Sequence, residues 1–316
     1  MSRRKKGSPV HGWVIVDKPS GITSTDVVGI VRRVFDARKA GHAGTLDPIA
    51  TGVLAVALGE ATKTVPFAMD ATKTYRFTAR WGEARDSDDA EGAVIATSDV
   101  RPTREEIERA IPKLVGRIEQ VPPRYSAIKV NGERAYDLAR DGEVVALEPR
   151  TVEIHEARLI AEPDGDHAEF EMRCGKGAYV RSWVRDLGQL LGTLAHVSAL
   201  RRTAIGGFSE ADAIALEKLK GFMHIPAAFE HLRPISTALD GIPALAVTGP
   251  DAVRLRSGNP IIVRATQFAR LTEANPSDDL QGLTVFLSTS EGEPVALAAL
   301  EAGELRPFRV FNFGAG

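Results

Sequence analysis

The run Gly44-Thr45-Leu46-Asp47-Pro48-Ile49-Ala50-Thr51-Gly52 is the most unusual stretch of this sequence. It places one carboxylate, Asp47, directly before a proline and between glycines. Pro48 restricts Asp47 to extended backbone conformations, and the glycines allow the chain to approach itself or a ligand closely. The run lacks the Gly-Lys-Ser/Thr ending of a phosphate-binding loop. On its own an Asp-Pro pair in a loop indicates a turn more often than a chemical site.

Regular elements flank this loop on both sides. Trp13–Val16 predicts a buried strand, and residues 17–21 predict a turn after it. Ser24 can cap a helix in which apolar residues repeat at helical spacing as far as Phe35. Val53–Leu58 is apolar throughout and predicts another buried strand.

Further elements follow downstream. Thr72–Trp81 alternates, which predicts a half-buried strand with Tyr75 on its apolar face. Thr103 and Glu106 form a capping-box pattern that begins a helix. Asn131-Gly132 between two short β-type runs predicts a hairpin. Two more elements are expected, a strand over residues 168–174 and a helix that ends near residue 192.

The composition changes after about residue 235. No lysine occurs beyond Lys220, and turn residues separate short β-type runs at 261–263, 283–287, 295–300 and 308–311. These runs predict a small all-β module of roughly 75 residues. Mixed helices and strands followed by such a module indicate an α+β fold with a β appendage.

The overall composition is that of an ordinary globular protein. Hydrophobic residues make up 43% and charged residues 26% of the chain, and its net charge is -2. One cysteine, Cys174, excludes a disulfide framework and fits a reducing compartment, so we expect a cytoplasmic protein. The apolar runs are far shorter than the ~20 residues that span a bilayer, and the histidines show no paired metal-ligand spacing.

Residues 44–52 nevertheless resemble the catalytic signature of the pseudouridine synthases. Other motifs, in chain order, make the whole resemble the bacterial synthases that modify position 55 in the T loop of tRNA. These motifs are Asp17-Lys18-Pro19-x-Gly21-x-Thr23-Ser24, Tyr125-Ser126-Ala127-x-Lys129, Tyr136-x-x-Ala139-Arg140-x-Gly142, Gly177-Ala178-Tyr179-Val180-Arg181 and His196-Val197-x-x-Leu200-Arg201-Arg202.

Three parts are expected along the chain. The basic residues at positions 3–6 predict a disordered tail over residues 1–10. The resemblance implies a catalytic domain over residues 11–235, which has a mixed, largely antiparallel sheet. A hairpin insertion at about residues 123–151 is expected to clamp the tRNA arm. Residues 240–316 fit a small RNA-binding β-barrel of the PUA type. The resemblance also suggests a monomer that needs no protein partner, no membrane, no cofactor and no metal.

It further implies a role for each matching residue. Asp47 would be the essential aspartate, and Arg181 would hold it with a guanidinium fork. Tyr75 would stack on the target base, while His42 would enter the RNA loop as the nucleotide flips out. Without the resemblance, each of these side chains has a plain alternative as a turn, surface, core or loop residue. The remaining residues expected to bind substrate are Asp89, Tyr179 and Leu200.

Several points stay open on the sequence alone. Residues 85–87 depart from the usual pattern, so either Asp88 or Asp89 can be the carboxylate that faces the uracil. Basic candidates for contacts with the RNA backbone are Lys18, Lys129, Arg140, Arg201 and Arg202. Two other functions remain as alternatives, a synthase that acts on another RNA and a tRNA-binding or tRNA-folding protein.

Overall fold

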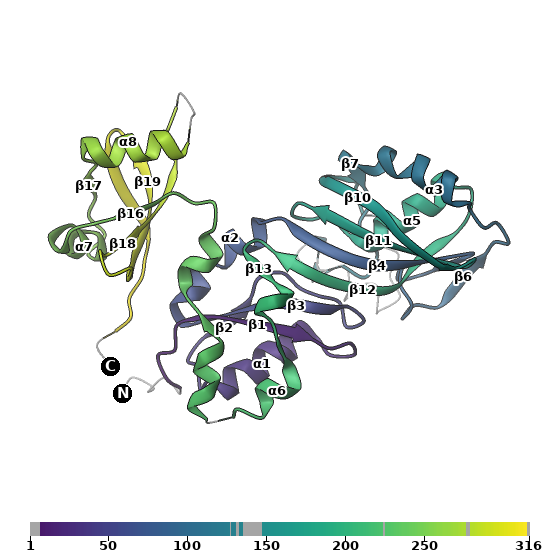
Figure 1. Cartoon of the computed structure of the whole chain (residues 1–316), viewed down its shortest axis with the longest axis horizontal. Helices are drawn as coiled ribbons and strands as arrows, with labels where there is room; N and C mark the ends of the chain where they lie inside the picture. Colours follow the sequence, from purple (N-terminus) through teal and green to yellow (C-terminus); the bar gives the residue numbers. More distant parts are fainter. Residues whose placement is uncertain are drawn as a thin grey trace.

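The computed structural model describes residues 7–126, 128–130, 133–134, 147–223, 225–275 and 279–314. The predicted Asn131-Gly132 turn, Tyr136, Arg140 and most of the basic tail lie outside these residues. Among the described residues, two larger sheets organise the chain, and Figure 1 shows them at opposite ends of an elongated molecule.

Eleven of the described strands form the larger sheet. Its main path runs β14-β1-β3-β12-β4-β11-β10-β7, with β2 on β3, β13 on β12 and β15 on β1. The strands are β1 (Gly12–Lys18), β2 (Ala40–His42), β3 (Thr51–Leu58), β4 (Lys73–Trp81), β7 (Gly116–Gln120), β10 (Arg150–Asp164), β11 (His167–Cys174), β12 (Ala195–Ile205), β13 (Phe208–Ser209), β14 (Ile214–Ala215) and β15 (Leu232–Arg233). Only the β1–β14 and β3–β12 pairs are parallel among these described strands, so the sheet is mixed and largely antiparallel, as predicted.

Helices cover this sheet and connect its strands. They are α1 (Ser24–Val34), α2 (Val65–Asp70), α3 (Arg104–Ala110), α5 (Val180–Leu190) and α6 (Leu216–Lys220), with short 3-10 turns at Gly59–Lys63, Ile111–Leu114, Glu210–Asp212, Pro226–His231 and Ile235–Leu239. The capping box of Thr103 and Glu106 begins α3 as expected. The cap of α1 is Thr23, whose hydroxyl accepts from the Asp26 N–H, so the expectation of Ser24 at this position is wrong. The Ser24 hydroxyl instead forms hydrogen bonds with the backbone of Leu46.

The core under α5 fixes where that helix begins. Trp183 lies on its buried face and contacts Phe77 of β4 and Phe170 of β11, with ring centroids 5.6 and 5.5 Å apart. The two phenylalanines are themselves cross-strand partners. Aromatic contacts of this kind add to the burial energy and restrict how the helix sits on the sheet. The first turn of α5 is therefore held above the middle of the sheet.

The C-terminal module is a five-stranded sheet with two helices. Its strands are β16 (Ala244–Ala246), β17 (Ile261–Ile262), β18 (Thr284–Ser288), β19 (Pro294–Glu301) and β20 (Glu304–Val310), and its helices are α7 (Gly249–Arg256) and α8 (Ala265–Ala274). The four predicted β-type runs overlap β17 to β20, but the two helices were not expected. The module shares a buried apolar cluster with the rest of the chain, to which Phe286 and Phe311 belong together with Trp13. In addition, the Lys63 ammonium donates to the Val310 carbonyl at 2.7 Å.

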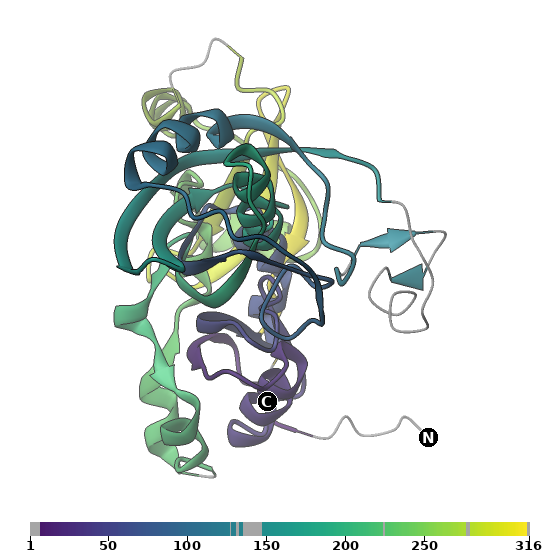
Figure 2. The ribbon, with the colours of Figure 1, turned by 90° about the vertical axis from the view of Figure 1, so that its right-hand side faces the viewer.

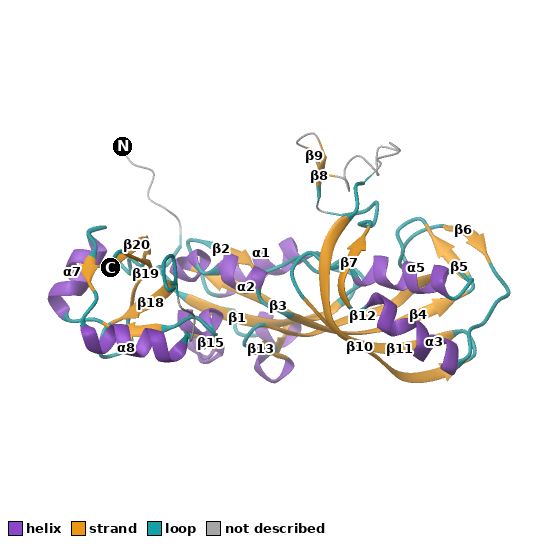
Figure 3. Cartoon of the chain, turned by 90° about the horizontal axis from the view of Figure 1, so that it is seen from above, coloured by secondary structure: helices purple, strands orange, loops and turns teal. Residues whose placement is uncertain are grey.

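Two small ribbons complete the described chain. β5 (Glu83–Arg85) pairs with β6 (Val94–Thr97), and β8 (Lys129–Val130) pairs with β9 (Glu133–Arg134). Figures 2 and 3 show the β8–β9 ribbon standing away from the body of the molecule. None of the helices in the described residues has the length and apolar character that crossing a bilayer requires.

Candidate active site

The Asp47 loop connects β2 to β3 and is held by the first residue of α1 and by the segment before that helix. The Ser24 hydroxyl accepts from the N–H of Leu46 at 2.9 Å and donates to its carbonyl at 3.0 Å. On the other side of Asp47, the carbonyl of Pro48 accepts from the N–H of Gly21 and from the Lys18 ammonium. Both residues adjacent to Asp47 are therefore held, which limits how far its carboxylate can move.

Lys18 and Arg202 are internal braces of this loop. Lys18 is fully buried and donates to three carbonyls, those of Pro19, Ile22 and Pro48. Arg202 is 1% exposed and donates through Nη2 to the carbonyl of Gly44, at the start of the loop. The expectation that Lys18 and Arg202 contact RNA phosphates is corrected, because neither is exposed and both are satisfied by backbone oxygens.

The register of two parallel strands brings the loop beside β12. Arg201 pairs with Thr51 and Arg202 with Gly52. Gly52 has a φ of +96°, and a Cβ built there would lie 2.2 Å from the Arg202 carbonyl. Only glycine fits this close approach, which explains the glycine that ends the signature. Leu200, just before this crossing, lines the same cleft as Asp47.

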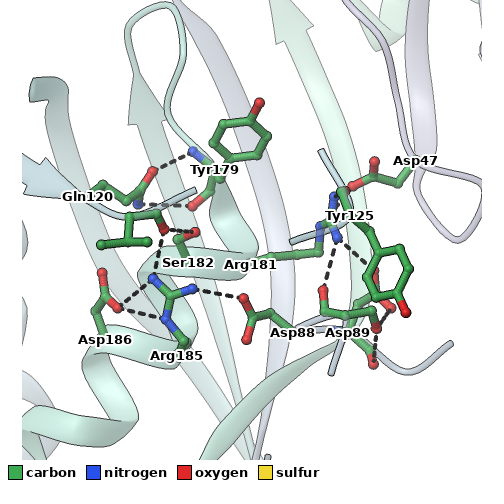
Figure 4. A network of polar contacts seen from close by, with 12 residues as sticks. Asp47, Asp88, Asp89, Gln120, Tyr125, Tyr179, Arg181, Ser182, Arg185 and Asp186 are labelled. Carbon is green, nitrogen blue, oxygen red and sulfur yellow. Dashed lines mark hydrogen bonds and ion pairs between the residues drawn. The ribbon is translucent and has the colours of Figure 1, made fainter. Parts of the chain in front are cut away.

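Arg181, in the first turn of α5, connects the Asp47 loop to the turn after β5. Its Nε lies 3.0 Å from Asp47 Oδ2, while its Nη1 donates to the Ser87 carbonyl at 2.9 Å. Its Nη2 donates to the carbonyl of Tyr125, also at 2.9 Å (Figure 4). The expected pairing of Arg181 with Asp47 is present, but the expected fork is wrong: one nitrogen contacts Asp47, and the others hold the surrounding backbone.

The turn at residues 87–89 sends its two carboxylates in different directions. Asp89 Oδ2 lies 3.4 Å from Arg181 Nη1, and Asp89 Oδ1 accepts from the Ser87 hydroxyl at 2.6 Å. Asp88 instead contacts Arg185 at 2.9 Å. Of the two alternatives left open by the sequence, Asp89 is therefore the one that lies beside Asp47 and Arg181.

Two clefts meet at Asp47 and Arg181. The first, about 520 Å³, is acidic, and the second, about 310 Å³, is more apolar. The residues that line the first are Asp47, Pro48, Asp86, Ser87, Asp89, Glu91, Gly92, Ala93, Tyr125 and Arg181. Those of the second include Leu46, Asp47, Lys73, Tyr75, Ser126, Tyr179, Arg181, Leu200 and Arg202. The side chain of Asp47 is 33% exposed against 4% for Arg181, so the carboxylate is the member of the pair that a substrate can reach.

Burial governs the protonation of these groups. It raises the pKa of Asp47 above its usual value, and the guanidinium of Arg181 opposes that rise. Burial also raises the pKa of Tyr75 and of Tyr179, so both phenols are neutral at physiological pH. The pKa of His42 is lowered by burial and by Arg202, so its ring is uncharged at pH 7.

Not every predicted residue joins this site. His42 lies at the end of β2 and lines neither cleft, and its Nδ1 is buried without a hydrogen-bond partner among the described residues. Arg201 is bound through two nitrogens to Asp17, at 2.9 and 3.1 Å. The backbone of Lys129 lies in the β8–β9 ribbon, and Arg140 is outside the described residues. Within those residues no group of three His, Cys, Asp or Glu side chains is arranged to hold a metal ion.

The arrangement suits chemistry at a sugar carbon. A reachable carboxylate held by an arginine can stabilise positive charge on a ribose, attack it, or remove a proton from it. The neighbouring cleft offers the rings of Tyr75 and Tyr179 and the side chains of two leucines, which fit the faces of a flat base.

Family models match most of the chain that builds this site. The TruB family pseudouridylate synthase (N terminal domain) model matches residues 32–180, and the tRNA pseudouridylate synthase B C-terminal domain model matches residues 181–240. The chain belongs to the TruB family of pseudouridylate synthases. The family resemblance drawn from the sequence motifs is thereby confirmed.

Relatives of this TruB family chain match it from end to end. A protein named tRNA pseudouridine synthase B from Caulobacter vibrioides is 54% identical over 99% of both chains. A protein of the same name from Bradyrhizobium diazoefficiens is 53% identical over 98% of this chain and 88% of its own. A third, from Dinoroseobacter shibae, is 51% identical over 100% of both.

Solved structures share the overall fold of this chain. A chain of a Cbf5-Nop10-Gar1 complex superposes with a TM-score of 0.72 at 24% identity, covering 95% of this chain and 85% of that one. A chain of an H/ACA RNP bound to a substrate RNA containing 2'-deoxyuridine gives 0.73 at 22% identity, covering 99% and 92%. The predicted α+β fold class, a pseudouridine-synthase core followed by a small C-terminal β domain, is confirmed.

Sequence patterns did not predict several residues that hold the site of this TruB family chain together. The side-chain amide of Gln120 donates to the Tyr179 carbonyl and accepts from the Tyr179 N–H, so it holds the residue before α5. For Ser24 the sequence pattern predicts only a helix cap. The partners of Gln120 and Ser24 lie 59 and 22 residues away, and no local pattern indicates such contacts. Arg185 could have been noticed, because it follows Arg181 by one helical turn.

Proposed function

We propose that this chain isomerises the uridine at position 55, in the T loop of tRNA, to pseudouridine. The observation that carries the proposal is Asp47, held by Arg181 at the junction of two clefts, in a chain 54% identical to a tRNA pseudouridine synthase B. A base inside a folded loop cannot reach such a carboxylate, so the target nucleotide has to flip out of the loop first.

The reaction gains and loses no atoms. The bond between N1 and C1′ breaks, the freed uracil turns within the cleft, and a new bond forms between C5 and C1′. C5 loses its proton, and N1, which carries none in uridine, gains one in the product. Asp47 acts while C1′ is electron-poor, by stabilising the charge, by bonding to C1′ or by removing a sugar proton. Arg181 keeps this carboxylate ionised against the effect of burial.

The neighbouring residues would hold the base. Tyr75 stacks on the uracil, with Tyr179 and Leu200 as apolar walls of the same cleft. Asp89, beside Arg181, accepts an N–H of the turning base. His42 would fill the space that the flipped nucleotide leaves, and its uncharged ring suits stacking between bases.

The same proposal assigns the rest of the chain. Residues 11–235 carry catalysis, with the hairpin insertion at residues 123–151 gripping the T arm, and residues 240–316 add a modest share of RNA affinity. The chain acts as a monomer in the cytoplasm and needs no protein partner. Its one thiol, Cys174, is buried and free, as suits a reducing compartment.

The test uses an unmodified tRNA transcript and the purified protein, with Asp47→Asn as the matched variant. Pseudouridine is mapped by carbodiimide treatment and primer extension. We expect one new stop at the T-loop uridine with the native protein and none with the variant. A stop elsewhere would assign a different uridine, and tight binding without any stop would favour a tRNA-folding protein instead.

A further inference from the structure

Two arginines on α5 hold the same tight turn of the chain. Arg181 binds the carbonyl of Ser87 and approaches the carboxylate of Asp89. Arg185 follows one helical turn later, on the same side of the helix, and its Nη1 donates to Asp88 Oδ2 at 2.9 Å. Figure 4 shows both arginines reaching this turn from the one helix. The turn is therefore held at two points, by Arg181 and by Arg185. Of these two arginines, Arg181 lines the clefts and Arg185 does not.

Asp88 adopts a backbone conformation that needs support. Its φ is +59°, in the left-handed region that residues other than glycine rarely adopt, although aspartate and asparagine tolerate it best. Its N–H donates to the carbonyl of Arg85, and its own carbonyl accepts from the N–H of Val197 at 3.0 Å. This conformation sends the side chains of Asp88 and Asp89 to different arginines. Holding Asp88 therefore also fixes the direction of Asp89.

Arg185 is itself fully engaged. Its Nη2 donates to the Val121 carbonyl at 2.8 Å and its Nε to Asp186 at 3.0 Å. The side chains of Arg185 and Asp88 are 23% and 15% exposed, so water screens their attraction only in part. Without the guanidinium, a largely buried carboxylate would stay unpaired, and the turn would gain by rotating it toward solvent.

We propose that Arg185 and Asp88 form a positioning pair, which sets the geometry of Asp89 and, through Arg181, that of Asp47. Neither residue lines the two clefts, so neither contacts a base held in them. This inference rests on the proposed function, because the geometry is measured by the rate of isomerisation. A displacement of ~1 Å at a reacting group costs on the order of 10²-fold in rate, so even a partial relaxation is measurable.

The test is a double-mutant cycle on the single-turnover rate at saturating tRNA. It compares Arg185→Ala, Asp88→Gly and the double variant, with Arg104→Ala as the control. Glycine adopts the left-handed backbone without strain, so Asp88→Gly keeps the fold and loses only the anchor. Arg104 forms an exposed ion pair with Glu108 on α3, away from both clefts, and its loss should leave the rate unchanged.

We expect each single variant to be about tenfold slower, and the double variant no slower than the worse single. The dissociation constant for tRNA should stay within about twofold, and Asp88→Asn should recover most of the rate, since asparagine tolerates this backbone and still accepts a hydrogen bond. Rates within about twofold of the native protein, losses that multiply in the double variant, or slowing that follows weaker tRNA binding would each overturn the proposal. If the native protein forms no pseudouridine at all, the proposed function fails first, and the positioning role fails with it.

Discussion

Replacing Ser24 with alanine should release the loop that carries Asp47. The Ser24 hydroxyl is the partner of both backbone groups of Leu46, at 2.9 and 3.0 Å, and the two residues are 2% and 3% exposed. Alanine fits the space but leaves a buried N–H and a buried carbonyl without a partner, directly before the reacting carboxylate.

The size of the effect follows from those two groups. Each buried and unpaired backbone group costs about 1–3 kcal/mol, so partial relaxation leaves a loss of roughly 2–4 kcal/mol in the free energy of unfolding. For a chain of this size that lowers Tm by roughly 3–6 °C. The relaxation moves Asp47 relative to Arg181, and we expect the single-turnover rate on tRNA to fall by about 10- to 100-fold.

Thr23→Ala is the matched control for this variant. Thr23 caps α1 by accepting from the Asp26 N–H at 3.1 Å, and its loss costs about 1 kcal/mol without touching the loop. Tm should fall slightly and the rate should not change. The reasoning is refuted if Ser24→Ala destabilises the fold yet keeps the native rate, or if Thr23→Ala slows the reaction to the same extent.

Three further predictions concern charged and titratable groups. Arg181→Lys should slow single turnover at least 100-fold while weakening tRNA binding less than tenfold, because one ammonium cannot contact Asp47 and two backbone carbonyls together. If the single-turnover rate and the tRNA affinity fall by the same factor, Arg181 has no part in the chemistry. Burial lowers the pKa of Lys18 from 10.5 to about 8. Between these two pH values the unfolded chain binds more protons than the folded chain. The free energy of unfolding therefore rises with pH, by up to ~1.4 kcal/mol per pH unit. Lys18→Met should remove this part of the slope in urea unfolding between pH 8 and 9.5, and parallel slopes for the two proteins would contradict it. Burial raises the pKa of the Cys174 thiol to about 12, so a thiol reagent at pH 8 should label the unfolded protein but not the native one, and rapid native labelling would contradict this.

The sequence predicted the elements of the fold where their patterns are local. Strict alternation gave β4 with Tyr75 on its apolar face, and the Thr103–Glu106 capping box gave the start of α3. The two helices of the C-terminal module were missed, because α7 and α8 are short and the β-type runs around them dominate the pattern.

The site was predictable in its residues but not in its contacts. The motifs brought forward Asp47 and Arg181, which lie 3.0 Å apart although they are far apart in the chain. The assignment of Lys18 and Arg202 to phosphate contacts failed for a physical reason. A charged residue in a sequence motif is usually solvated. Lys18 and Arg202 are instead buried, and each donates a hydrogen bond to a backbone carbonyl of the Asp47 loop. Only the tertiary structure reveals these partners.

The most direct test of the central claim, that the Asp47 carboxylate does chemistry and not binding, measures two quantities on one variant. Asp47→Asn is compared with the native protein in tRNA dissociation constant and in single-turnover formation of pseudouridine. We expect the dissociation constant to stay within about tenfold while product formation is abolished, because the carboxylate acts on the transition state. A collapse of binding, or a rate close to that of the native protein, would contradict the account.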